Sequence, residues 1–293
     1  MRPMATARPY VLTPSLHEVR IGPYSFHLTA ACRQPPDAAP LEWQRGQCVS
    51  CQRGTMTANN SDGQSLAAQV VTAARILAAN GHEDHVLGHV STRLPQGDRI
   101  LMKGGGIGLG ELTEEGLLTL DLDGNVLEGT FRLHAEYPIH TEVYRARPDV
   151  QAVVHTHPIA ATVLSGSGRG PDVLGHEGCW FAPEGIPCFT LTADLIVNAA
   201  LGSALAQDLG RARGILMRNH GTTTVGSSVA EACIGAIFLE KMCAMQLMAG
   251  SLPIHGSPST EAIAKRMRMY SDRSIEAIWQ FHQRALQRSS RRL

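Results

Sequence analysis

The chain lacks a net charge, because its 26 lysines and arginines balance its 26 aspartates and glutamates. A general binder of nucleic acid or anionic membranes carries an excess of basic residues, so both functions are disfavoured. The chain also lacks an unbroken apolar run of about 18 residues, the length that crosses a bilayer. Its first residues lack the basic segment and apolar core of a secretory signal. We therefore expect a cytoplasmic protein without a nucleic-acid or membrane partner.

Cysteine is present but forms no compact framework. The seven cysteines are odd in number and spread along the chain, so reduced thiols are the simplest interpretation. A zinc site made from Cys32, Cys48 and Cys51 is a weak alternative, since no second Cys-x-x-Cys pair accompanies it.

Residues 1–60 lack sustained hydrophobic periodicity and are rich in proline, arginine and glutamine. We interpret them as a poorly ordered or loosely docked extension, and Met56 is an alternative natural start. Residues 61–293 are then one domain that ends in a helical tail.

Within that domain, helical and strand patterns alternate. Helical spacing of apolar residues predicts helices over 64–79, 192–209 and 228–248, the last opened by a capping box at Ser228 and Glu231. Short strands and turns are expected over 90–127. Residues 214–225 predict strand, turn, strand, with Gly221 supplying a positive φ. Alternation of this kind indicates an α/β domain but does not fix the strand order.

The most informative feature is a pair of histidines, His155 and His157, at the end of an apolar run. Residues two apart on a strand point to the same face, so both imidazoles can share one metal. A chance pair on a half-buried strand is the alternative. His220, expected on the turn within 214–225, adds a third imidazole, and three imidazoles with a carboxylate make an open catalytic shell.

The segment that precedes this pair predicts a helix, with Pro138 in its first turn and Pro148 ending it. Glu136 and His140 then lie one turn apart on one face. Glu136 is either a ligand or an end charge that interacts with the helix dipole.

The order Glu-x3-His, His-x-His-Pro and Asn-His-Gly resembles the class II aldolase/adducin family, which includes fuculose-phosphate aldolase and ribulose-phosphate 4-epimerase. The resemblance spans about residues 64–250 and includes the segments 88–93, 103–107, 112–115 and 121–125. It implies a three-layer α/β/α catalytic domain with a central, mainly antiparallel sheet, in a cyclic homotetramer with sites between subunits. It also implies that His155, His157 and His220 bind a divalent metal (Zn, Mn, Co or Fe), with Glu136 as fourth ligand or as the acid/base beside it.

The chain departs from the sugar-phosphate members where they bind phosphate. His89, the glycines 105–106 and the pair His134-Ala135 stand where those aldolases carry amide and hydroxyl donors. A phosphorylated sugar is therefore disfavoured. We expect His89, Arg93, Lys103 and His134 to bind a small-molecule carboxylate instead, although Arg93 and Lys103 are also compatible with solvated surface charges.

Residues 136–155 are most similar to the decarboxylase branch of the family, whose members act on dihydroxyphthalate or hydroxy-carboxymuconic semialdehyde. This similarity predicts a metal-dependent, non-oxidative decarboxylase of a hydroxylated aromatic or enol carboxylate. Such a lyase needs a proton donor, for which His176 and Glu136 are the candidates; a surface histidine is the alternative for His176.

Three other functions remain open at this point. They are a sugar or sugar-acid aldolase or epimerase, a non-haem iron oxygenase with the same ligands, and a non-enzymatic scaffold like the adducin heads. The retained histidines count against the scaffold.

Overall fold

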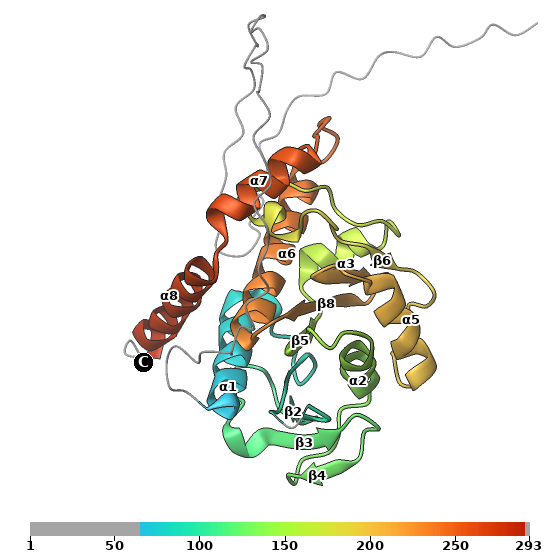
Figure 1. The fold of residues 1–293 in the computed structure, drawn as a ribbon, viewed down its shortest axis with the longest axis vertical. Coiled ribbons are helices and arrows are strands. Elements are labelled where there is room, and N and C mark those ends of the chain that lie inside the picture. Colours follow the sequence, from blue (N-terminus) through green and yellow to red (C-terminus); the bar gives the residue numbers. More distant parts are fainter. Residues whose placement is uncertain (1–64, 96, 291–293) are drawn as a thin grey trace, which may run out of the picture. The chain divides into compact units, whose positions relative to one another are not determined.

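The computed structural model describes residues 65–95 and 97–290, so the predicted extension over 1–60 and the cysteines at 32, 48 and 51 lie outside the described residues. A single eight-stranded sheet runs through this part of the chain, in the order β4-β3-β2-β1-β5-β8-β7-β6 (Figure 1). Its strands are β1 (His89–Arg93), β2 (Arg99–Lys103), β3 (Leu117–Asp121), β4 (Val126–Glu128), β5 (Ala152–Thr156), β6 (Cys188–Phe189), β7 (Gly214–Met217) and β8 (Gly221–Gly226). Every neighbouring pair is antiparallel except β6 and β7. The expected mainly antiparallel α/β/α fold is confirmed.

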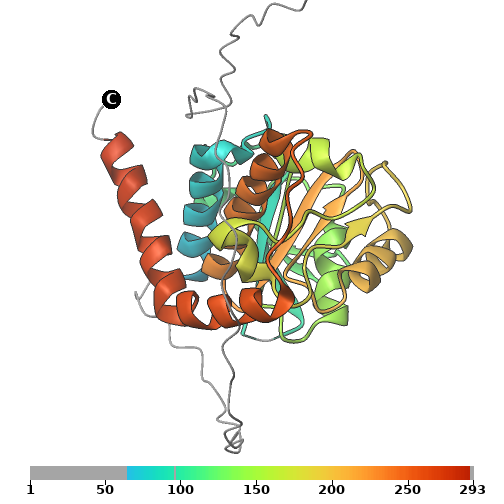
Figure 2. The ribbon, with the colours of Figure 1, turned by 90° about the horizontal axis from the view of Figure 1, so that it is seen from above.

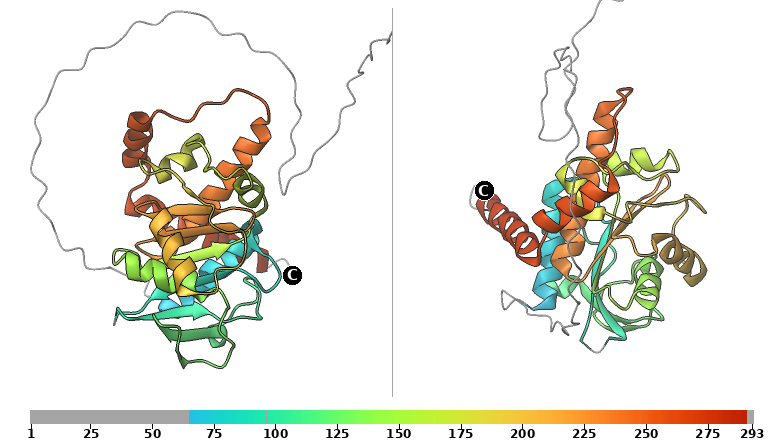
Figure 3. Two further views of the ribbon diagram at one scale, coloured as in Figure 1. Left: turned by 90° about the vertical axis from the view of Figure 1, so that its right-hand side faces the viewer. Right: turned by 45° about the horizontal axis from the view of Figure 1, so that its top comes forward.

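Helices cover both faces of the sheet (Figures 2 and 3). The helical elements are α1 (Leu66–Leu77), η1 (Ala78–His82), η2 (Glu114–Gly116), α2 (Tyr137–Ala146), α3 (Ile159–Ser165), α4 (Gly175–Gly178), η3 (Cys179–Phe181), α5 (Ala199–Leu209), α6 (Val229–Ala249), α7 (Ser259–Met269) and α8 (Asp272–Ser290). One core cluster packs α2 and α5 against one face of the sheet. Two further clusters pack α1, α3, α6 and α8 against the other face.

Alternate residues of β5 face these two layers. Val153 packs in the α2/α5 layer, whereas Ala152 and Val154 pack in the α1/α6 layer. His155 therefore points toward α2, on the same face as Val153. The α2 helix begins after Glu136 with proline in its first turn, as expected, and ends at Ala146.

The helix predicted over 192–209 is shorter in the structure. Its first turn begins at Ala199, because the Asn198 side chain accepts the amide hydrogen of Leu201 and so caps the helix there. The preceding residues form a loop, and the Ile196 amide of this loop donates to the Glu136 carboxylate.

Helix α6 is long and apolar enough to cross a membrane, yet half of that stretch is buried within the domain. It packs against α1, α3 and β8, which is typical of a core helix. Its Glu240 carboxylate accepts hydrogen bonds from the amides of Ala160 and Ala161 at 2.9 and 2.8 Å. This contact fixes the start of α3, immediately after His157 and Pro158.

Candidate metal centre

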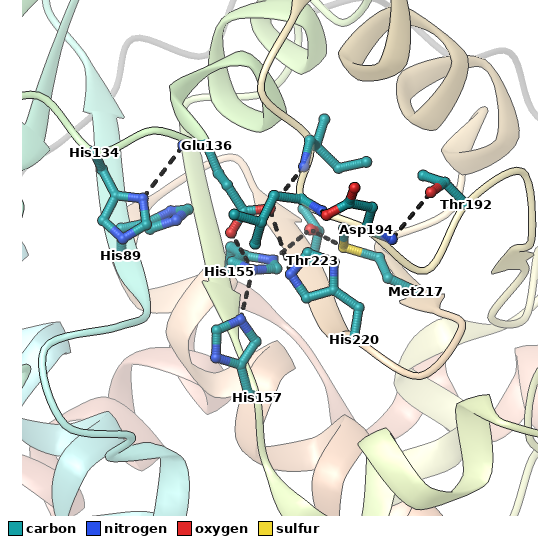
Figure 4. Close-up of polar contacts among 12 residues, drawn as sticks. His89, His134, Glu136, His155, His157, Thr192, Asp194, Met217, His220 and Thr223 are labelled. Carbon is teal, nitrogen blue, oxygen red and sulfur yellow. Dashed lines mark hydrogen bonds and ion pairs between the residues drawn. The ribbon is translucent and has the colours of Figure 1, made fainter.

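Three imidazoles and one carboxylate converge at the end of β5 (Figure 4). His155 lies on β5 and is fully buried, and His157 follows two residues later. Their Nε2 atoms are 3.0 Å apart. His220 lies in the turn between β7 and β8, and its ring stacks on His157 with a centroid separation of 5.3 Å. The sequence-predicted histidines are therefore brought together.

The turn that carries His220 differs from the expectation in one respect. The positive φ of 54° belongs to Asn219, not to Gly221, and asparagine tolerates this left-handed conformation better than most residues. Ser165 Oγ accepts the Asn219 amide hydrogen at 2.9 Å. Gly221 is required for space instead, since a Cβ there would lie 2.5 Å from the Thr156 carbonyl oxygen.

Glu136 supplies the carboxylate from the residue that precedes α2. Its Oε1 accepts the Ile196 amide hydrogen at 2.8 Å and lies 3.4 Å from His220 Nε2, while Oε2 lies 3.8 Å from His155 Nε2. Burial alone would raise the pKa of Glu136, but the contacts with His220 and the Ile196 amide outweigh it and lower the pKa. An ionised carboxylate therefore faces the imidazoles.

Hydrogen bonds behind the cluster orient two of the rings. His155 Nδ1 lies 3.3 Å from Thr223 Oγ1, and His157 Nδ1 lies 2.9 Å from Asp84 Oδ2. Because Asp84 and Thr223 occupy the Nδ1 positions, the Nε2 lone pairs face the cluster. A carboxylate behind a ligating histidine is a common arrangement in metal sites.

This donor set fits a divalent metal. One ligand atom from each of Glu136, His155, His157 and His220 lies within 4.8 Å of the others. His220 Nε2 is buried and, within the part of the chain that the structure describes, makes no hydrogen bond of normal geometry. Burial, followed by the neighbouring imidazoles, lowers the pKa of His155 well below its usual value, so its lone pair is free to bind a metal. Three imidazoles and a carboxylate suit Zn, Mn, Co or Fe.

A second group of polar residues borders the cluster. His89 is the register partner of His155 on β1, and its ring lies 4.9 Å from that of His155 and 4.0 Å from that of His134 (Figure 4). Burial and then the Lys103 charge lower the pKa of His134 to about 4. Lys103 is itself buried, which lowers its pKa to about 8, and it donates to the carbonyls of Val86 and Gly104.

Two other predicted site residues lie apart from this cluster. The Arg93 guanidinium donates to the backbone carbonyls of Val150, Gly97 and Tyr144, which hold it against the scaffold. His176 is exposed on α4. Within the described residues, no hydrogen bond, ion pair or ring contact joins His176 to the cluster.

Sequence reasoning missed the residues that support the site from a distance. Asp84 lies 73 positions before His157, and the Ile196 amide carries no side-chain signal at all. The polar residues Ser91 and Tyr144 had a readable signal, since they recur at strand spacing from His89 and at helical spacing from His140.

Known proteins share sequence and fold with this chain. Residues 68–247 match the model of the Class II Aldolase and Adducin N-terminal domain. The chain is 33% identical over 195 residues to 3,4-dihydroxyphthalate decarboxylase from Arthrobacter keyseri, covering 62% of this chain and 77% of that protein.

Two solved structures have a similar fold. An aldolase II superfamily protein from Pseudomonas syringae superposes with a TM-score of 0.69 at 26% identity, covering 76% of this chain and 92% of the other. An L-fuculose 1-phosphate aldolase from Glaciozyma antarctica superposes with a TM-score of 0.66 at 23% identity, covering 80% and 94%. The family match, which spans more than half of the chain, establishes that this protein belongs to the class II aldolase and adducin family.

Proposed function

We propose that this chain is a metal-dependent carbon–carbon lyase that decarboxylates a hydroxylated aromatic or enol carboxylate without consuming dioxygen. The observation that carries the proposal is the pairing of the metal-ligand cluster with Lys103, His134 and His89, a group suited to a carboxylate. Similarity to a dihydroxyphthalate decarboxylase supports the same substrate class.

His155, His157 and His220 would hold the metal, with Glu136 as the fourth ligand. When bound there, a divalent metal supplies Lewis-acid stabilisation of negative charge on a substrate oxygen. The lowered pKa of Glu136 favours a ligand role over that of a proton-donating acid, because the carboxylate is ionised at neutral pH.

We assign substrate recognition to Lys103, His134 and His89, which lie beside the proposed metal ligands. An ammonium has three N–H donors, and Lys103 donates two of them to backbone carbonyls; we assign the third to the substrate carboxylate. His134 is half-buried at the edge of the cluster. When the carbon–carbon bond breaks, carbon dioxide leaves, its electron pair stays on the substrate as an enolate, and a proton then adds to carbon.

His176 remains our proposed source of that proton, acting on a neighbouring subunit. This role depends on a homotetramer, which we propose together with a cytoplasmic location. The exposed position of His176 on α4 is compatible with a role across a subunit interface.

The test is a turnover assay on the full chain loaded in turn with Zn, Mn, Co and Fe(II). We expect one carbon dioxide per molecule of 3,4-dihydroxyphthalate with no dioxygen uptake. His155→Ala and His220→Ala should lose metal and turnover, whereas the exposed His255→Gln should retain both.

Other outcomes would overturn the proposal. Cleavage of fuculose 1-phosphate or epimerisation of ribulose 5-phosphate would indicate a sugar-phosphate enzyme. Stoichiometric dioxygen uptake with iron would indicate an oxygenase. Full metal content in both alanine variants would refute the ligand assignment.

A further inference from the structure

A chain of four buried polar side chains runs away from the metal centre between β1 and α2. His89 Nδ1 lies 2.6 Å from His140 Nε2, and His140 Nδ1 lies 2.6 Å from Ser91 Oγ. Ser91 Oγ in turn lies 2.8 Å from the Tyr144 hydroxyl. All four side chains are at most 1% exposed, so water does not compete for these hydrogen bonds.

The two elements place these residues by their own periodicities. His89 and Ser91 are two residues apart on β1 and point to the same face, and His140 and Tyr144 are one turn apart on α2. Arg93, the next residue on the same face of β1, lies over the Tyr144 ring at 4.8 Å and donates to the Tyr144 carbonyl. The outer end of the chain is thereby held in place.

The direction of these hydrogen bonds is set by Tyr144, at the end farthest from the metal centre. Burial raises the pKa of Tyr144, so the phenol keeps its proton. Among residues 65–95 and 97–290, Ser91 Oγ is the one side-chain acceptor that the Tyr144 hydroxyl contacts. If the phenol donates to Ser91, then the Ser91 hydroxyl is free to donate to His140 Nδ1.

The direction of the hydrogen bonds at Ser91 also fixes which nitrogen of His140 and of His89 carries the proton. When His140 Nδ1 accepts from Ser91, its proton resides on Nε2 and is donated to His89 Nδ1. The His89 proton must then reside on Nε2. The reversed direction would leave the buried Tyr144 hydroxyl without an acceptor, which is unfavourable. Burial also lowers the pKa of His140 to about 3, in keeping with a neutral ring.

His89 Nε2 lies at the other end, where it is buried and has no hydrogen-bond partner among the described residues. It belongs to a group with His134 and Glu136 whose ligand atoms lie within 4.8 Å of one another. In Figure 4, His89 and His134 lie together on the side of His155 away from His220. An unpaired buried donor next to a metal site is an incomplete interaction that a substrate oxygen can complete.

We propose that Tyr144, Ser91 and His140 form a one-way hydrogen-bonded chain that holds His89 as its Nε2–H tautomer, ready to donate to an oxyanion of the substrate beside the metal. The identity of that oxyanion as a carboxylate or enolate rests on the proposed function. The tautomer itself does not. His140, Ser91 and Tyr144 are positioning residues, and His89 is the residue that contacts substrate.

The first experiment measures the tautomers directly, in the full zinc-loaded chain with ¹⁵N-labelled histidine rings. Long-range ¹H–¹⁵N spectra, assigned with His89→Asn and His140→Leu variants, should show protonated Nε2 and unprotonated Nδ1 for both His89 and His140. A proton on Nδ1 of either ring overturns the proposal. No substrate is needed, so this result does not depend on which reaction the protein catalyses.

The second experiment removes Ser91 from the series of hydrogen bonds that links Tyr144 to His89. Ser91→Ala should turn the single tautomer of His89 into a mixture while zinc content stays unchanged, and Ser91→Thr should restore it. Thr92→Val is the matched control, because Thr92 is the adjacent buried residue of β1 and its hydroxyl donates to the Gln151 carbonyl instead. A His89 spectrum that is unchanged in Ser91→Ala contradicts the one-way chain.

The third experiment tests donation with salicylate, an unreactive hydroxylated aromatic carboxylate. Saturating salicylate should move the His89 Nε2 proton downfield in the wild-type protein. Its affinity should fall about twofold to tenfold in Ser91→Ala, in inverse proportion to the fraction of His89 that keeps the Nε2–H tautomer. An unmoved proton refutes the donor role. Failure to release carbon dioxide from 3,4-dihydroxyphthalate would refute only the proposed function.

Discussion

Asp84 is the residue whose charge most directly supports a proposed metal ligand. Its carboxylate accepts from His157 Nδ1, which fixes the ring orientation and makes Nε2 a better electron donor. We expect Asp84→Asn to weaken metal affinity by roughly tenfold to a hundredfold. Competition with a chromogenic chelator measures this change, and Asp98→Asn, at an exposed aspartate, is the matched control. Equal affinities of the two variants would contradict the role of Asp84.

His82 makes stability depend on pH. Burial lowers its pKa from 6.5 to about 4, and the residue is 1% exposed. Below pH 6.5 the unfolded chain binds a proton at His82, whereas the folded protein binds it only near pH 4. The free energy of unfolding of the metal-free protein should therefore fall as the pH is lowered, by about 2 kcal/mol from this residue between pH 7 and 5.

Urea unfolding at several pH values checks the contribution of His82. The His82→Gln variant should show a shallower loss of stability with falling pH than the wild-type protein. The exposed His255→Gln should keep the wild-type slope. Parallel curves for His82→Gln and wild type would show that His82 is not the responsible group.

At the scale of elements, the contact between α2 and α5 places Glu136. Gly202 of α5 lies so close to α2 that a Cβ would sit 2.5 Å from the Pro138 carbonyl oxygen. Alanine normally stabilises a helix relative to glycine by about 1 kcal/mol, so this glycine is needed for close packing and not for its flexibility.

Gly202→Ala should therefore destabilise the protein by about 1–3 kcal/mol through overpacking, and should also weaken metal binding, because Pro138 is two residues from Glu136. Thermal or urea unfolding gives the first effect and metal titration gives the second. Ser203→Ala on the same helix should be nearly neutral. A stabilised Gly202→Ala protein would mean that the helices separate at no cost.

The same elements show how far the sequence could predict the fold and site. Helix α2 was predictable because Pro138 and Pro148 bracket one helical pattern, and His155 and His157 because strand period places them together. The start of α5 was not, because a cap at Asn198 overrides the apolar spacing that extends back to Thr192. The contacts of Arg93 with the carbonyls of Tyr144 and Val150 and of Asp84 with His157 join segments far apart in sequence, which local patterns do not encode.

At the scale of the whole molecule, the proposed ligands and the described core clusters lie within residues 67–286. A chain that begins at Met56 should therefore keep its metal content, unfolding midpoint and activity within error of the full chain. Metal analysis, urea unfolding and the carbon dioxide assay measure the three properties. Loss of any of them would show that residues 1–55 contribute to the fold or site.

The pairing of His89 with His155 across β1 and β5 sets the distance between the proposed hydrogen-bond donor and the proposed metal ligand. Neighbouring strands keep opposing side chains at a nearly fixed spacing, of about 5 Å between Cβ atoms, and β5 is paired on both sides, with β1 and β8. The gap between the proposed metal and the proposed donor therefore cannot widen without breaking a central ladder. A site of this kind should discriminate sharply among positional isomers of one compound, since only one spacing of oxygen atoms matches the gap.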